Sequence, residues 1–136
     1  MQGPFTYVNR NNAGNYDHET AWKNDMQAIW NLSRMWYFTG NEQYAQKAHD
    51  ILLAWANTMT TFGGIESGLD LGDYAFRQGG AADIVRGTWP GWTAADTTTV
   101  SNFFKNVYLP ATGVNSSAGV LGPSNKGALQ MAGALA

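Results

Sequence analysis

The strongest constraint in this sequence is a repeated spacing of apolar residues at three- and four-residue steps. Such positions mark one face of a helix in residues 17–39, and residues 41–60 repeat the pattern. The two stripes are Trp22, Met26, Ile29, Leu32 and Trp36, followed by Tyr44, Ala48, Ile51, Leu52, Trp55 and Met59. Because a link of about three residues joins them, the two helices must be antiparallel neighbours. The sequence therefore predicts a helical hairpin over residues 17–60.

Two further apolar patterns extend this prediction along the chain. A second hairpin is expected over residues 71–109, with a Pro-Gly turn in the segment TWPGW, and a third begins over residues 125–136. Residues 1–16 are expected to form an N-terminal loop, and strand patterns are weak throughout. We expect one all-α domain, residues 1–136, of stacked antiparallel helical hairpins that form a partial (α/α) toroid or barrel.

Four helix-end signals support these boundaries. Asp17 is a plausible N-cap of the first helix, and Gly40 is suited to end it. Asn41 can cap the second helix. Thr93 and Asp96 have the spacing of a capping box at the start of the fourth helix, although Asp is shorter than the usual Glu.

The last apolar pattern still continues where the sequence stops at Ala136. An unpartnered helix would leave an apolar face exposed to water, at a cost in free energy. We therefore expect a fragment or a minimal version of a larger helical toroid. A homo-oligomer in which a second copy covers the last helix is the alternative.

The composition excludes several classes of protein. Eight Lys and Arg against ten Asp and Glu give a net charge of −2 with no basic stripe, which argues against nucleic-acid binding. No apolar run approaches the ~18 residues of a membrane helix. The absence of Cys excludes disulfides and thiolate chemistry, and two His without an HExxH spacing predict no metal site. We expect no cofactor. The low charged fraction of 13%, with 13% aromatic residues, suits a polar, sugar-handling surface.

The segment AIWNLSRMWYFTGNEQYAQKAHDILLAWA resembles the helix-TG-helix segment of the alginate-lyase superfamily. The matching residues include Thr39, Gly40, Tyr44, Ala48 and Trp55. The segments DYAFRQGGAADIVRGTWPGWT and GPSNKGALQMAGALA resemble the family's middle hairpin and a later loop-to-helix segment. The resemblance extends over residues 20–136 and is best over residues 28–56. Tetratricopeptide repeats use similar spacings, but the hairpin period here is about fifty residues rather than 34.

This resemblance implies a polysaccharide lyase that cleaves a uronic-acid-containing glycan, of the alginate or glucuronan type, by β-elimination. The expected partner is thus an acidic polysaccharide, and relatives of this kind are secreted or periplasmic. Residues 1–12 do not have the pattern of a signal peptide. By sequence alone the protein is therefore either cytoplasmic or a mature or trimmed form.

A β-elimination needs a group that neutralises the uronate carboxylate, a base and an acid. By resemblance, Asn125 falls at the carboxylate-neutralising Asn of the family, although it could simply be an N-cap. Lys126 stands where close relatives have a His, and we expect this cation to help bind the acidic sugar. His18 and Tyr74 are the further catalytic candidates, with helix capping and core packing as their respective alternatives. His49 is expected to be structural or on the surface.

Substrate binding is expected from two arginines and two tryptophans. Arg77 and Arg86 could clamp a carboxylate, and salt bridges to Asp residues are the alternative. Trp89 and Trp92 flank the Pro-Gly turn, where aromatic rings can stack on sugars or pack the turn onto the helices.

Two other function classes stay open at this point. The scarcity of catalytic side chains suits a non-catalytic helical-repeat binding module or an inactive fragment. Glu66, Asp70 and Asp73 are expected to cluster in one loop, and paired carboxylates are what a glycoside hydrolase on an α/α toroid would need.

Overall fold

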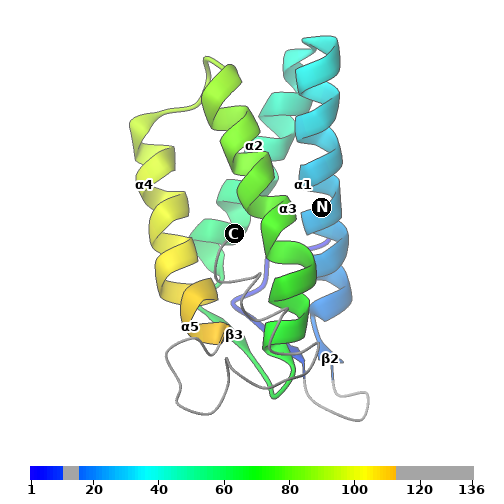
Figure 1. Cartoon of the computed structure of the whole chain (residues 1–136), viewed down its shortest axis with the longest axis vertical. Helices are drawn as coiled ribbons and strands as arrows, with labels where there is room; N and C mark the ends of the chain where they lie inside the picture. The colour runs from blue at the N-terminus through cyan, green and yellow to red at the C-terminus, as the bar shows by residue number, and fades with distance from the viewer. Residues whose placement is uncertain (11–15, 113–136) are drawn as a thin grey trace.

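The computed structural model describes residues 1–10 and 16–112, and this part of the chain is mostly helical, as predicted (Figure 1). The helices are α1 (Glu19–Thr39), α2 (Glu42–Thr58), α3 (Ser67–Thr88), α4 (Ala94–Phe103), the π-helix η1 (Phe104–Tyr108) and the short α5 (Leu109–Ala111). Among the described residues, no helix is both long and apolar enough to cross a membrane.

The four long helices alternate in direction along the chain. Figure 1 shows α1 and α3 running one way and α2 and α4 running the other. The most extensive contacts of α1 are with α3 and then α2, while α2 also packs on α4. The two hairpins therefore lie side by side, with α1 beside α3 and α2 beside α4.

A three-stranded sheet closes one end of the bundle, and the sequence analysis missed it. Strand β1 (Tyr7–Arg10) pairs antiparallel with β2 (Tyr16–Asp17) and parallel with β3 (Thr61–Gly63), in the order β2-β1-β3. The expectation that residues 1–16 form only a loop is thus wrong for β1. The strands are two to four residues long, which is too short for a periodic pattern to appear in the sequence.

The core forms where the predicted apolar stripes meet. Trp22, Met26 and Ile29 of α1 have no exposed surface, and neither does Trp55 of α2. The Trp22 indole Nε1 donates a hydrogen bond of 2.7 Å to the hydroxyl of the buried Tyr108 in η1. Burial raises the pKa of the Tyr108 hydroxyl, because a phenolate would be poorly solvated there. The phenol is therefore a neutral, structural group.

Three of the predicted helix ends are confirmed. Gly40 ends α1 in the left-handed conformation at φ 66°, and the Asn41 side chain accepts a hydrogen bond from the backbone N–H of Gln43. Thr93 and Asp96 form the reciprocal capping box of α4.

Two other predicted boundaries differ from the structure. His18, rather than Asp17, precedes the first residue of α1, at φ 61° and with no capping hydrogen bond from its side chain. Helix α3 begins at Ser67 instead of residue 71, so Asp70 and Asp73 are helical residues and not part of a loop. The glycines and polar residues before Leu71 concealed the first turn of α3, because they carry little apolar periodicity.

Candidate functional site

A row of alternating cationic and aromatic side chains follows the seam between α1 and α3. We call it the cationic–aromatic row, and its members in spatial order are Arg34, Trp30, Phe76, Arg77, Tyr74 and Lys23. Aromatic rings present apolar faces to sugar C–H groups, and guanidinium and ammonium groups bind carboxylates. The row therefore has the chemistry needed to bind an acidic glycan.

The contacts within the row are continuous. The Arg34 Cζ lies 5.7 Å from the Trp30 ring centroid, and the Trp30 and Phe76 rings meet edge to face at 6.4 Å. The Arg77 Cζ lies 4.9 Å from the Phe76 ring and 4.3 Å from the Tyr74 ring. These distances are within the range of cation–π and aromatic pairing.

Helical spacing explains how the row is assembled. Trp30 and Arg34 are four residues apart on α1, and Tyr74 and Arg77 are three apart on α3, so each pair shares a face. Gly80 lets the two helices approach, because a Cβ at this position would lie 2.9 Å from the Trp30 ring. This glycine, which lowers the helix propensity of α3, thus has a packing role.

At one end of the row, Lys23 enters a cluster of charged residues. Its ammonium group lies 5.4 Å from the Tyr74 ring centroid, 2.5 Å from a Glu19 carboxylate oxygen and 2.8 Å from the Asp70 carboxylate. Arg10 of β1 also binds Asp70 and lies 3.3 Å from Glu66. The Asp70 side chain is fully buried. This charged cluster consists of Arg10, Glu19, Lys23, Glu66 and Asp70.

Burial raises the pKa of Asp70 to about 6, although Lys23 and Arg10 favour its ionised form. The hydrogen bond between Asp70 and Glu19 also raises the pKa of Asp70. The pKa of Glu19 is lowered by Lys23 and by the same hydrogen bond. The cluster contains three carboxyl groups and only two cations, so the charges do not balance when all three are ionised. Asp70 is the last to ionise because it has no solvent contact. Asp70 is therefore the titrating member of the cluster near pH 6.

We expect this titration to make the protein less stable as the pH rises from 3.8 to above about 6. In that window the unfolded Asp70, with an ordinary pKa of 3.8, has lost its proton while the folded state still holds it. Stability is therefore highest below the window and is lost as the pH passes the folded pKa, by up to about 3 kcal/mol. Urea unfolding at several pH values should show this slope. The Asp70→Asn variant should lose it, and an unchanged slope would contradict the assignment.

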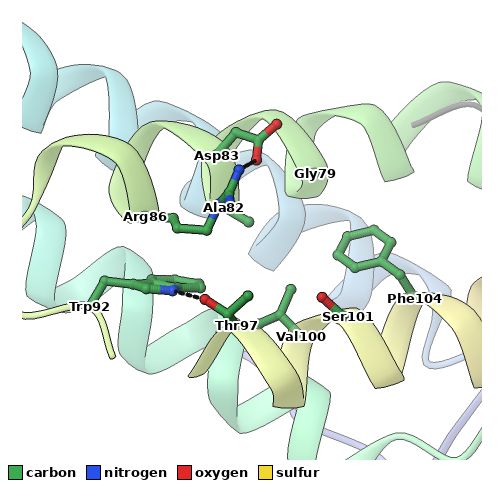
Figure 2. A pocket seen from close by; sticks show the side chains of 9 residues that line it. All are labelled: Gly79, Ala82, Asp83, Arg86, Trp92, Thr97, Val100, Ser101 and Phe104. Carbon is green, nitrogen blue, oxygen red and sulfur yellow. Dashed lines mark hydrogen bonds and ion pairs between the residues drawn. The ribbon is translucent and has the colours of Figure 1, made fainter. Parts of the chain in front are cut away.

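A second group of candidate residues lies on the other side of α3. Arg86 and Trp92 line a pocket of about 290 Å³ between α3 and α4 (Figure 2). The Arg86 guanidinium donates a 2.8 Å hydrogen bond to Asp83, and the Trp92 indole Nε1 donates one of 2.8 Å to the Thr97 hydroxyl. Arg77 and Arg86 are nine residues apart, about two and a half helical turns, which places them on opposite faces. One carboxylate therefore cannot contact both arginines, and for Arg86 the structure shows the salt bridge to Asp83 that was the alternative.

Comparison with known proteins bears on what these surfaces do. The family model described as alginate lyase matches residues 3–111, which is most of the 136-residue chain. The chain belongs to the alginate lyase family. No curated protein and no solved structure matches it. The family assigned from the helix-TG-helix segment is thus confirmed.

In this alginate lyase family member, two predicted site residues, Tyr74 and Arg77, lie together in the cationic–aromatic row. Arg77 also donates a hydrogen bond to the backbone carbonyl of Asp73, one turn earlier. His18 lies elsewhere, stacked on the Phe5 ring at 3.8 Å between centroids. Asn125 and Lys126 lie outside the described residues and beyond the matched range, so their roles stay predictions.

The two tryptophans of the Pro-Gly turn have different surroundings in this alginate lyase family member. Trp89 is only 8% exposed, so its ring serves mainly in packing, whereas Trp92 is partly exposed at the pocket. Both rings meet His49 of α2 edge to face, at 5.3 Å and 5.7 Å. The His49 Nε2 lies 3.3 Å from an Asp96 carboxylate oxygen. His49 therefore joins α2 to the turn and to the start of α4, a structural position as expected.

Lys23, Trp30 and Arg34 were not predicted from the sequence as candidate site residues. Their spacings of seven and four residues place them on one face of α1, and this signal was available in the sequence. What the sequence did not show is that this face borders Tyr74 and Arg77. Within the described residues, no group of three or more His, Asp or Glu side chains is arranged to hold a metal ion.

Proposed function

We propose that this chain carries the glycan-binding surface of a polysaccharide lyase that cleaves a uronic-acid-containing glycan of the alginate or glucuronan type. The observation that supports this most directly is the cationic–aromatic row, in which Tyr74 and Arg77 meet Lys23. Family membership supports lyase chemistry. The α1–α3 and α2–α4 neighbours are also consistent with a portion of an α/α toroid, and we propose a secreted or periplasmic location.

The proposed reaction is a β-elimination. A base removes the proton at C5 of the uronate, the C4–O4 bond breaks, a C4=C5 double bond forms, and the leaving oxygen takes up a proton. Negative charge accumulates on the carboxylate as C5 loses its proton, so a cation placed there stabilises the transition state. Arg77 lies over the Tyr74 ring, and we assign it to carboxylate binding, whereas Lys23 is already bound to Glu19 and Asp70.

Tyr74 is the proposed proton-transfer group because its phenol ring lies against the Arg77 guanidinium. A group that moves the C5 proton must lie near the bound carboxylate, since C5 carries that carboxylate. Asn125 is proposed to assist in neutralising the carboxylate, on the basis of the resemblance of the SNKG segment. The hydrolytic alternative is less well supported, because Glu66 and Asp70 both face Arg10 and Asp70 has no solvent contact.

We expect Arg77→Gln to lower kcat/KM on alginate or glucuronan about 10- to 100-fold, because one charge-assisted contact is lost. The assay follows the ultraviolet absorbance of the unsaturated product. Lys105→Gln, which changes an exposed cation in η1, is the matched control and should keep the activity. A folded protein that is inactive on several uronate polymers would contradict lyase function. If the protein bound such a polymer without cleaving it, and Arg77→Gln weakened this binding, the result would indicate a non-catalytic binding module.

A further inference from the structure

We infer that the α3–α4 pocket is a second glycan-binding site that takes one acidic sugar ring, separate from the cationic–aromatic row. The pocket has an apolar floor from Ala82, Val100 and Phe104. Arg86, Trp92 and Ser101 supply a cation, an aromatic ring and a hydroxyl around it (Figure 2). The choice of a uronate as ligand rests on the proposed function.

The geometry of α3 separates the two sites. Arg77 belongs to the row beside α1, while Arg86 lines the pocket beside α4. Their spacing of nine residues turns the side chains to opposite faces of the helix. A single sugar ring therefore cannot contact both arginines, and a ligand in the pocket leaves the row free.

The aromatic wall of the pocket is fixed before any ligand binds. The Trp92 indole Nε1 donates to the Thr97 hydroxyl at 2.8 Å, and its backbone N–H donates to the Trp89 carbonyl at 3.2 Å. The His49 ring meets the Trp92 ring at 5.7 Å. A side chain held in this way loses little conformational entropy when a sugar stacks on it.

The cation of the pocket is available for exchange. The Arg86 side chain is 53% exposed and pairs with Asp83, whose side chain is 73% exposed. Ion pairs between exposed groups contribute only about 0–1 kcal/mol. A sugar carboxylate can therefore replace Asp83 at little cost and accept two parallel hydrogen bonds from the guanidinium.

The size of the pocket limits the ligand to a short segment. Its volume of about 290 Å³ is just below the roughly 300 Å³ at which the usual range of ligand pockets starts. This space suits one ring rather than several. Figure 2 places the Ser101 hydroxyl on α4 facing the pocket, where it can bind a ring hydroxyl. The polymer would continue outside the pocket over the exposed ends of α3 and α4.

The test is a titration of the full chain with a mannuronate disaccharide, followed by calorimetry and by the indole N–H signals in a ¹H–¹⁵N spectrum. We expect the Trp92 signal, assigned with Trp92→Phe, to shift. Arg86→Gln should weaken binding at this site about tenfold or more, whereas Arg77→Gln should leave the Trp92 response unchanged. Both substitutions remove an arginine from a partly exposed surface of the same helix, so each is a matched control for the other.

Three results would overturn the inference. The first is an unperturbed Trp92 signal at saturating disaccharide. The second is a Trp92 response that Arg86→Gln does not weaken, and the third is an equal response to uncharged cellobiose. Lyase assays on the same samples separate this inference from the proposed function. A Trp92 shift that depends on Arg86, in a protein without lyase activity, would support the second site and contradict the proposed function. Lyase activity in a protein whose Trp92 signal does not shift would support the proposed function and contradict the second site.

Discussion

Replacing Arg10 with methionine is expected to lower the free energy of unfolding by about 1–3 kcal/mol, because it removes one of the two cations that bind the buried Asp70 and also the ion pair with Glu66. Methionine keeps much of the side-chain volume, so the loss reports mainly on charge. Lys23 would remain as the other cation, with Glu19 and Glu66 nearby. Urea unfolding near pH 7, where Asp70 is ionised in the wild-type protein, should show the full effect.

The control for this prediction is Arg34→Met, because Arg34 is exposed and lies over the face of Trp30. It should change stability by less than about 1 kcal/mol. The Arg10→Met loss should also shrink toward pH 4.5, where Asp70 holds a proton. Equal losses for the two variants at pH 7 would show that the charged cluster does not stabilise the fold.

Asp25→Ala is expected to cost about 2–4 kcal/mol, through a different part of the molecule. The Asp25 carboxylate is 2% exposed and accepts hydrogen bonds from the backbone N–H groups of Gln2 and Gly3, at 2.8 Å and 2.9 Å. It also accepts one of 2.9 Å from the indole Nε1 of the fully buried Trp55. Alanine would leave the buried Trp55 indole N–H unpaired, which costs about 1–3 kcal/mol, and would release the part-buried backbone donors of Gln2 and Gly3.

Thermal and urea unfolding would measure the Asp25→Ala loss, and hydrogen exchange of Gln2 and Gly3 would show whether the N-terminal segment detaches. Asp25→Asn keeps one acceptor oxygen and should give an intermediate loss. Asp73→Ala, at an exposed position of α3, is the control and should be nearly neutral. If Asp25→Ala were as mild as Asp73→Ala, the hydrogen bonds of Asp25 would not hold this end of the chain.

The local features of the helices could be predicted from the sequence. Gly40, Asn41 and the pair Thr93–Asp96 act where the sequence placed them, because capping depends on residues within one turn. The start of α1 was misjudged because His18 takes a left-handed conformation that is uncommon for a residue with a side chain. Its ring instead stacks on Phe5, a contact that only the fold creates.

The candidate site could be predicted from the sequence only in part. Tyr74 and Arg77 could be paired from their spacing, and the half-turn between Arg77 and Arg86 could have been calculated in the same way. The partners Lys23 and Trp30 lie on another helix, so their contact with α3 depends on how the two helices are aligned. Gly80 decides part of that alignment, because the Trp30 ring occupies the space that a side chain would fill.

The helices, most of their ends and the family could be predicted from the sequence, because apolar periodicity, capping and motif resemblance are properties of neighbouring residues. Which helix faces meet depends instead on tertiary packing. The parallel pairing of β1 with β3 joins Val8 to Phe62, and Asp70 finds Arg10 sixty residues away. The opposite faces of α3 became two separate surfaces because α1 packs on one side, while the pocket toward α4 opens on the other. Such pairings depend on packing and register over long separations, which local sequence patterns do not encode.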